Sequence, residues 1–261
     1  MNKKYFKILL LGLLVVVGIE LLLTFFNKEE TPEEVTIDEK QFNAELFDTS
    51  SSFYRYEDGK YSSVLGIDVS EHNGRIDFNK VKENGIDFVI IRCGRRGYAK
   101  GIIYSDSYFE EYYQKAKEAD LKVGVYFFSQ AINENEAIEE AQYTLEMIKD
   151  KKLDLGVSYD LEKISYDESR TDYLSKEQAT ANALAFFNTI GTKQKTMLYT
   201  NHDCLETFFD IEQLSNHDIW YAQYYTEPQC DYKIKIWQYT DEGTLPGLYT
   251  SVDINMMFIE K

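Results

Sequence analysis

The chain has 261 residues and a formal net charge of −17, with 28 lysines and arginines against 45 acidic residues. α/β barrels of this size form single domains, so the length does not require a second domain. The excess negative charge argues against a nucleic-acid partner, because such binding depends on basic side chains that replace counterions along the phosphate backbone. The three cysteines form no C-x-x-C motif, which disfavours a zinc site, although a disulfide between Cys204 and Cys230 remains an open alternative.

The N-terminus combines lysines with a long apolar stretch. Lys3, Lys4 and Lys7 precede residues 8–26, which are apolar except for a few small or polar positions. A helix that rises ~1.5 Å per residue spans a bilayer core of ~30 Å over such a length. Because lysines precede the stretch and acids follow it, residues 1–26 are predicted to anchor the chain in the cell membrane, with the remainder extracellular. A cleaved signal peptide is the alternative, but no small-x-small cleavage site follows.

Residues 27–63 are polar, acidic and without a sustained apolar period, so they are predicted to be a spacer. Residues 64–261 then form the folded domain, in which short apolar runs alternate with amphipathic stretches. Eight runs have the length and composition of strands: 64–69, 88–93, 123–128, 156–161, 196–200, 219–223, 234–239 and 249–254.

Helices are expected between these strands up to about residue 209. Ser107, Asn133 and Ser175 each stand three residues before Glu or Gln, which is typical of a helix N-cap. Asp77 and Asp106 are interpreted as helix caps or first-turn acids. The alternation of strand and helix predicts a parallel sheet, and eight strands predict its closure into a barrel. The expected fold class is therefore α/β, with few helices in its last part.

Asp160 and Glu162 end a buried apolar strand. Side chains two residues apart leave a strand on the same face, with Cα atoms roughly 6.6 Å apart, so the two carboxyls are expected side by side. Their mutual repulsion raises one pKa, and a protonated acid beside an ionised one is what glycoside hydrolysis needs. A solvated strand end is the alternative. Asp68 and Asp253 are expected on the same rim, because the first and eighth strands become neighbours when the barrel closes.

Six blocks of the sequence resemble glycoside hydrolase family 25, the N-acetylmuramidase lysozymes. They are GIDVS with HNG and ID (66–77), VIIR (89–92), GVYFF (124–128), YDLE (159–162), WQY (237–239) and VDIN (252–255). The resemblance begins near residue 64 and continues to the C-terminus. It implies an irregular, flattened, TIM-like β/α barrel that cleaves the β-1,4 bond between N-acetylmuramic acid and N-acetylglucosamine in peptidoglycan, without metal or cofactor.

By position, Glu162 resembles the general acid of this family. Asp160 is similar to its partner carboxylate, which either attacks the anomeric carbon or orients the N-acetyl group of the substrate. Asp68 and Asp253 resemble supporting acids, and the charges of Asp160 and Asp68 are expected to raise the pKa of Glu162. The implied substrate-binding residues are Tyr126, Tyr159, Trp237 and His72. For Trp237 a core position is the alternative, and for His72 a structural turn.

The sequence thus predicts a membrane-anchored muramidase with a monomeric, extracellular catalytic domain that acts on peptidoglycan glycan strands. One alternative is a barrel at the cell surface that binds glycan without cleaving it. Another is a divalent-metal phosphoesterase that uses the same acids as oxygen ligands. With only three histidines in the chain and no basic patch beside the acids, the second alternative is the weaker.

Overall fold

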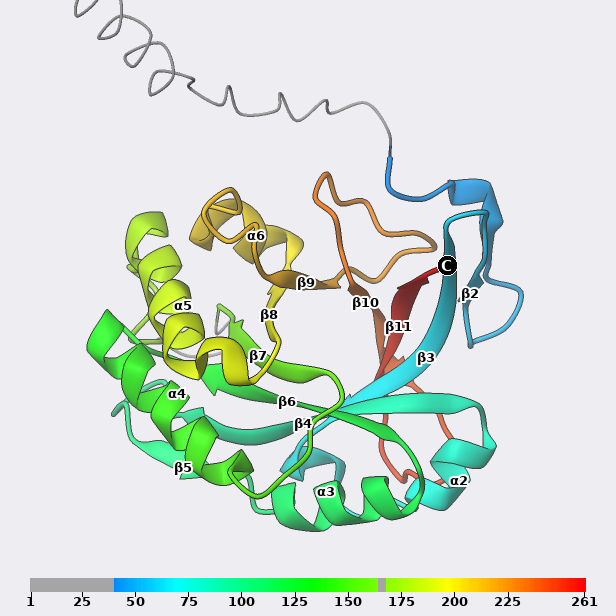
Figure 1. Ribbon diagram of the computed structural model, residues 1–261, viewed down its shortest axis with the longest axis horizontal. Helices are drawn as coiled ribbons and strands as arrows, with labels where there is room; N and C mark the ends of the chain where they lie inside the picture. The colour runs from blue at the N-terminus through cyan, green and yellow to red at the C-terminus, as the bar shows by residue number, and fades with distance from the viewer. Residues whose placement is uncertain (1–39, 164–167) are drawn as a thin grey trace, which may run out of the picture. The chain divides into compact units, whose positions relative to one another are not determined.

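The computed structural model describes residues 40–163 and 168–261 (Figure 1). Gln41–Lys261 forms one compact unit. Within the described ranges, no helix is both long and apolar enough to span a bilayer. The predicted anchor, residues 1–26, lies outside the described residues, as does the first part of the predicted spacer.

Eight strands close into a barrel, as predicted. Their order is β3-β11-β10-β9-β8-β7-β6-β4, and pairing between β3 and β4 closes the barrel. The strands are β3 (Tyr61–Val69), β4 (Ile86–Arg96), β6 (Lys122–Ser129), β7 (Gly156–Leu161), β8 (Thr196–Asn201), β9 (Asp218–Ala222), β10 (Ile236–Gly243) and β11 (Val252–Glu260). A short strand, β5 (Ile103–Ser105), pairs with the end of β4, and β1 (Phe47–Asp48) pairs with β2 (Arg55–Tyr56) in a separate sheet.

The direction of the last strand corrects the prediction of a parallel sheet. Every neighbouring pair from β3 and β4 around to β9 and β10 is parallel. In contrast, β11 is antiparallel to both β10 and β3. An antiparallel strand can follow its neighbour through a short loop, whereas a parallel one needs a long crossover. The chain therefore turns back directly after β10, and the first residues of β11 reach the rim where the other strands end.

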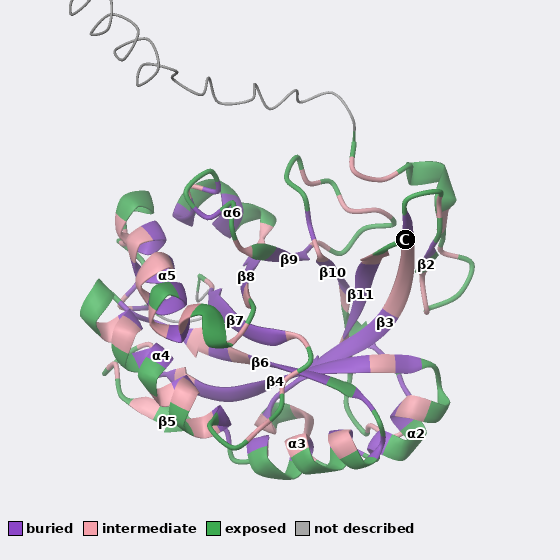
Figure 2. Ribbon diagram, viewed as in Figure 1, coloured by how far each residue is buried: buried purple, intermediate pink, exposed green. Residues whose placement is uncertain are grey.

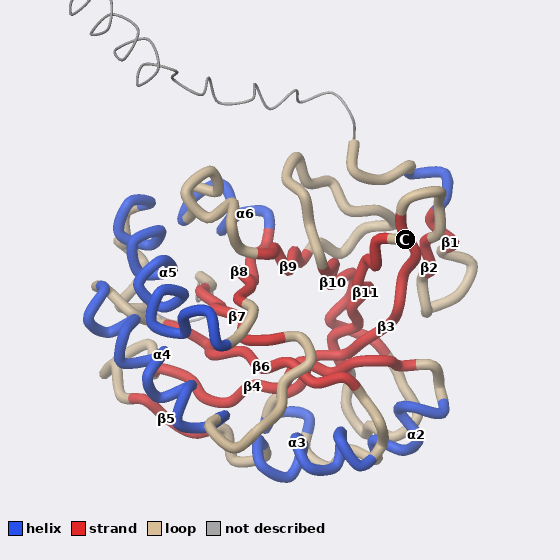
Figure 3. The backbone as a smooth tube through the Cα atoms, in the orientation of Figure 1, coloured by secondary structure: helices blue, strands red, loops and turns tan. Residues whose placement is uncertain are grey.

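Helices cover the outside of the barrel along its first half (Figure 3). They are α2 (Phe78–Glu83), α3 (Phe109–Glu118), α4 (Glu134–Ile148), α5 (Lys176–Ile190) and α6 (His202–Phe208). Three predicted caps accept a backbone N–H in the first turn of their helices: Asp77, Asn133 and Ser175. Ser107 does not cap α3, which corrects the prediction. Its hydroxyl donates to Oε2 of Glu71 (2.9 Å) instead, and the N-cap position falls on Tyr108.

The barrel interior is filled at the end where the parallel strands begin. Buried apolar side chains that belong to one cluster lie there: Phe88, Ile90, Met197, Ile236 and Met257. Gly66 has no room for a side chain, because a Cβ at this position would lie 2.2 Å from the ring of Phe88. The strands are buried over most of their length (Figure 2). In such a barrel, only the opposite rim is available for chemistry.

The N-terminal segment, residues 41–61, packs beside β3, β10 and β11, which corrects its assignment to a spacer. The ring of Phe42 stacks on Phe258 with centroids 3.9 Å apart, and Tyr54 stacks on Tyr239 at 4.4 Å. The side-chain amide of Gln41 also exchanges hydrogen bonds with the backbone of Ile234. The folded domain therefore begins near Gln41 rather than at residue 64.

We expect Phe42→Ala to lower the free energy of unfolding of the chain from residue 41 by about 3 kcal/mol, because the substitution removes a packed aromatic ring. Leu46→Ala is the matched control in the same segment. Leu46 is 44% exposed, so its replacement should change stability by no more than about 0.5 kcal/mol. Urea unfolding of both variants measures the difference, and equal effects would contradict the packing described for this segment.

Candidate active site

Four carboxyl groups gather at the rim where the parallel strands end. Asp68 is the penultimate residue of β3, Asp160 is the penultimate residue of β7, and Glu162 directly follows β7. Asp253 is the second residue of β11 and pairs in register with Asp68. The four acids come together because β11 reaches this rim with its first residues rather than its last.

Asp68 is held by two side-chain amides. Its Oδ2 accepts hydrogen bonds from Nε2 of Gln238 (2.9 Å) and from Nδ2 of Asn255 (2.8 Å). Burial raises the pKa of Asp68, while these donors act in the opposite direction because they favour the ionised form. The negative charge of Asp68 in turn raises the pKa of the other three acids.

Asp253 completes this arrangement by hydrogen bonding to Asp68. Burial and then the charge of Asp68 raise the pKa of Asp253 to about 10. Asp253 therefore carries a proton at neutral pH and donates it in the hydrogen bond to Asp68. This bond stabilises the charge of Asp68, whose pKa it lowers.

Asp160 and Glu162 hydrogen bond to each other. Burial, followed by the charge of Asp68, raises the pKa of Glu162 to about 7, whereas the bond with Asp160 lowers it. The pKa of Asp160 is raised well above its ordinary range, first by burial and then by the charges of Glu162 and Asp68. The pair therefore keeps a proton at neutral pH. The expected effect of Asp68 on the pKa of Glu162 is confirmed, whereas the expected effect of Asp160 is wrong, because the hydrogen bond with Asp160 lowers this pKa.

One oxygen of this pair has no partner among the described residues. Oδ1 of Asp160 is buried and makes no hydrogen bond, and the same holds for Oγ of Ser158, two residues earlier on the same face of β7. A buried polar atom without a partner costs on the order of 1–3 kcal/mol. Such atoms are uncommon in folded proteins and call for an explanation. At this rim, Oδ1 is free to attack or orient a bound group.

Aromatic side chains face the acids from the neighbouring strands. Tyr126 on β6 lies within electrostatic reach of Asp68, Asp160 and Asp253, and burial is the main reason its pKa is raised. Its ring meets that of Trp220 on β9 edge to face, with centroids 6.0 Å apart. The indole N–H of Trp220 donates to Oδ1 of Asn255 (2.7 Å). Tyr126 therefore belongs to this rim.

Three aromatic residues of this rim were not predicted: Tyr199, Trp220 and Tyr224. The hydroxyls of Tyr199 and Tyr224 both donate to Oε1 of Gln238 (3.1 Å each). Tyr224 is 49% exposed, so it offers an aromatic ring to a ligand at the rim. Gln238 links both rings to Asp68. The sequence could have indicated Gln238, because it directly follows the outward-facing Trp237 on β10 and successive residues of a strand face opposite sides.

Arg92 supplies a buried positive charge near the acids. On β4, its Nε lies 2.9 Å from Oδ2 of Asp106 and its Nη2 lies 3.1 Å from Oε1 of Glu71. The charge of Arg92 lowers the pKa of Asp160 and opposes the effect of burial. Asp106 does accept the backbone N–H of Tyr108 (3.0 Å). Its buried ion pair, however, makes it more than the simple helix cap that was predicted.

Tyr159 lies on the wrong face to meet a ligand beside the acids, so its predicted substrate contact is wrong in this structure. Strand alternation places it opposite to Asp160, where it is fully buried. Its ring packs on Phe186 of α5 with centroids 5.1 Å apart, and its hydroxyl lies at hydrogen-bond distance from Oγ of Ser129 (2.9 Å). Tyr159 therefore supports the helix layer.

Trp237 also lies away from the four acids. Trp237 is fully buried on the outer face of β10, where its indole N–H donates to the backbone oxygen of Gln223 (2.8 Å) and its ring meets Phe47. The core alternative for Trp237 is therefore the correct one. His72 lies exposed in a 3-10 turn, Glu71–Asn73, and its binding role stays a prediction.

The alternatives involving cysteines and metal ions can also be compared with the structure. All three cysteines are free thiols, so Cys204 and Cys230 are not paired. Over residues 40–163 and 168–261, no group of three or more histidine, cysteine or acidic side chains is placed to hold a metal ion.

Comparisons with known proteins point to one family. The family model described as glycosyl hydrolases family 25 matches residues 67–248. The autolytic lysozyme of Clostridium acetobutylicum is 29% identical over 196 residues, which cover 74% of this chain and 55% of that protein. The chain thus spans about half the length of that curated relative.

Solved structures share the fold. The modular autolysin LytC from Streptococcus pneumoniae, in complex with a synthetic peptidoglycan ligand, has a TM-score of 0.66 and 25% identity, over 76% of this chain and 47% of that one. A family 25 glycosyl hydrolase from Bacillus anthracis has a TM-score of 0.64 and 21% identity, over 79% of this chain and 94% of that one.

Asp68→Asn should lower the pKa of Glu162 from about 7, because it removes the nearby negative charge and keeps an oxygen that can accept from Gln238 and Asn255. Titration of the carboxyl carbon signals by NMR measures this pKa. Asp77→Asn, at the cap of α2, is the control and should leave it unchanged. A Glu162 pKa equal to that of the parent protein in Asp68→Asn would show that Asp68 does not control the pair.

Proposed function

Because the chain belongs to family 25 of the glycosyl hydrolases, we propose that it is a muramidase that hydrolyses the β-1,4 bond between N-acetylmuramic acid and N-acetylglucosamine in peptidoglycan. The observation that carries this proposal is the pair Asp160 and Glu162, which keeps a proton beside Asp68 and leaves Oδ1 of Asp160 free. The matched curated relative is an autolytic lysozyme, and one similar structure holds a peptidoglycan ligand, which supports the substrate class.

Glu162 is the proton donor in this proposal. Glycoside hydrolysis begins when an acid protonates the leaving oxygen while a carboxylate stabilises the positive charge that develops at the anomeric carbon. An acid with a pKa of about 7 suits this role near neutral pH. The developing positive charge favours the ionised form of Asp160, so the proton that the pair shares is then held by Glu162.

Asp160 faces the anomeric carbon. In the first step, either Oδ1 of Asp160 or the substrate's own N-acetyl oxygen, oriented by Asp160, bonds to this carbon. The bond to the leaving oxygen breaks, and that oxygen takes the proton of Glu162. In the second step, Glu162 accepts a proton from water as the water oxygen displaces the first nucleophile. Two displacements retain the configuration of the sugar.

The membrane anchor is a second part of the proposal. The lysines that precede residues 8–26 and the acids that follow them support a single span with the barrel outside the cell. Residues 27–40 then connect this span to the compact unit that begins at Gln41.

Glu162→Gln keeps the shape of the side chain but removes the transferable proton. Release of muropeptides from peptidoglycan should fall by at least ~10²-fold while the fold persists. Asp160→Asn should also abolish most turnover, because it removes the carboxylate that faces the anomeric carbon. Asp77→Asn is the control, since Asn caps a helix about as well as Asp. If Glu162→Gln were as active as the parent protein and gave products with the same reducing ends, the proposed mechanism would be wrong.

The proposed topology predicts that a reporter fused after Lys261 is accessible to a membrane-impermeant label in intact cells. The lysines of the N-terminus should stay inside because short loops rich in lysine are retained in the cytoplasm. A reporter fused before Met1 is the matched control and should be labelled only after the cells are opened. Labelling in the reverse order would contradict the extracellular barrel.

A further inference from the structure

The backbone ladder between β6 and β7 ends just before Glu162. Ser129 and Leu161 form the last registered pair of these two strands. Gln130 and Glu162 are the next residues along each strand, and here a hydrogen bond from a side chain takes the place of backbone pairing. Nε2 of Gln130 donates to the backbone oxygen of Glu162 at 3.4 Å, a long hydrogen bond. The amide therefore holds the first residue that lies beyond the sheet.

The other end of this amide is fixed by two hydroxyls. Oε1 of Gln130 accepts hydrogen bonds from the hydroxyls of Ser169 and Thr171 (3.0 Å), whose oxygens lie 2.9 Å from each other. All three side chains are buried, and Gln130 is fully so. The reverse orientation of the amide would place its oxygen against the carbonyl oxygen of Glu162. Because this carbonyl oxygen can only accept, it determines that Nε2 is directed toward Glu162 and that Oε1 faces the two hydroxyls.

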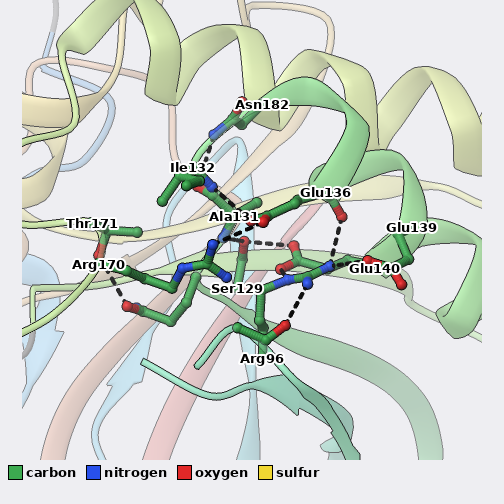
Figure 4. A network of polar contacts seen from close by, with 12 residues as sticks. Arg96, Ser129, Ala131, Ile132, Glu136, Glu139, Glu140, Arg170, Thr171 and Asn182 are labelled. Atoms are coloured by element: carbon green, nitrogen blue, oxygen red, sulfur yellow. Dashed lines mark hydrogen bonds and ion pairs between the residues drawn. The ribbon is translucent and has the colours of Figure 1, made fainter. Parts of the chain in front are cut away.

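A partly buried ionic network holds the segment that carries these hydroxyls (Figure 4). Arg170, which lies between them in sequence, pairs with Glu136 of α4 at 2.8 Å. Arg96 at the end of β4 pairs with Glu140 of the same helix at 2.7 Å, and Ser129 donates to the other oxygen of Glu140 (2.6 Å). Buried ion pairs contribute little net stability compared with well-packed apolar residues. Their evident effect here is to fix β4, β6, α4 and residue 170 in one arrangement around Gln130.

From this geometry we propose that Gln130 is a positioning residue for Glu162. It holds the backbone of residue 162 so that the carboxyl stays in its buried place beside Asp160 and Asp68. The inference rests on the proposed muramidase function, in which Glu162 donates the proton. Residue 162 follows the last ladder pair of β7, so loss of this bond would let the carboxyl move toward solvent.

The surroundings of Glu162 make such a movement measurable. Its carboxyl is near titratable groups from six elements or loops: Asp160 (β7), Asp68 (β3), Asp253 (β11), Tyr199 (β8), Tyr224 (after β9) and Cys204 (α6). Burial and the charge of Asp68 keep the pKa of Glu162 high, and both effects weaken as the group moves outward. A displaced Glu162 would lose its proton at lower pH.

Gln130→Met in the full-length protein keeps the length of the side chain and removes both polar ends. We expect kcat on peptidoglycan to fall about 10-fold or more with little change in KM, since a misplacement of ~1 Å can cost on the order of 10²-fold. The alkaline limb of the kcat profile should also move to lower pH. A loss of stability alone reduces the amount of folded enzyme and leaves the position of this limb unchanged.

Two further substitutions separate positioning from stability. Thr171→Val keeps the shape but removes one hydroxyl that holds Gln130, so the limb should move in the same direction by less. Added to Gln130→Met, it should change the limb no further, because both act through one amide. Thr180→Val is the control. This hydroxyl is equally buried but bonds to the backbone near Phe208 and Asp210, so its loss should lower Tm and leave the limb in place.

If the alkaline limb of the kcat profile of Thr171→Val lies at the same pH as in the parent protein, the proposal is wrong, even if Gln130→Met does not fold. If the alkaline limb of Thr180→Val moves as far as that of Thr171→Val, the proposal is also wrong, because the position of the limb would then depend on the stability of the protein. The proposed function fails by a different result, namely parental activity in Glu162→Gln. An inactive Glu162→Gln together with an unmoved limb in the Gln130 and Thr171 variants would reject only the positioning role.

Discussion

The site depends on one strand that runs against its neighbours. Because β11 is antiparallel, its first residues lie at the rim, where Asp253 pairs with Asp68 and Asn255 donates to the same carboxylate. A parallel β11 would carry its last residue, Glu260, to this rim instead, and Asp68 would lose two of its partners. The charge of Asp68 could then not be stabilised in the same way. Since that charge raises the pKa of the other acids, the direction of β11 controls the chemistry of the whole rim.

Much of the barrel could be predicted because its strands are short apolar runs, and because acids two residues apart share a face. The direction of a strand could not be predicted, because the apolar composition of a run is the same in a parallel and in an antiparallel strand. The predicted meeting of Asp68 and Asp253 on neighbouring first and last strands is therefore correct, but Asp253 lies at the start of its strand rather than near its end. The last run was expected to end near residue 254, whereas the strand begins at Val252. Pairing with β3, distant in sequence, determines where this strand lies.

Other differences arise from contacts that are also distant in sequence. The aromatic residues of the N-terminal segment have no regular spacing, and their partners, such as Phe258, lie at the opposite end of the chain. Asp106 looks like a helix cap until Arg92 is placed beside it. Tyr159 and Trp237 belong to blocks shared with the family, but membership of a block does not say which face a side chain occupies. The alternation that places Asp160 inward already places Tyr159 outward.

The filled end of the barrel determines how a polymer can approach the acids. Phe88, Ile90 and their neighbours close the interior, so no chain can pass through the barrel as through a tunnel. A long substrate must instead lie across the rim, where any internal segment is as accessible as an end. An enzyme of this shape needs no free terminus to start from. Such access suits a polymer tied into a mesh, in which chain ends are few and most bonds lie between cross-links.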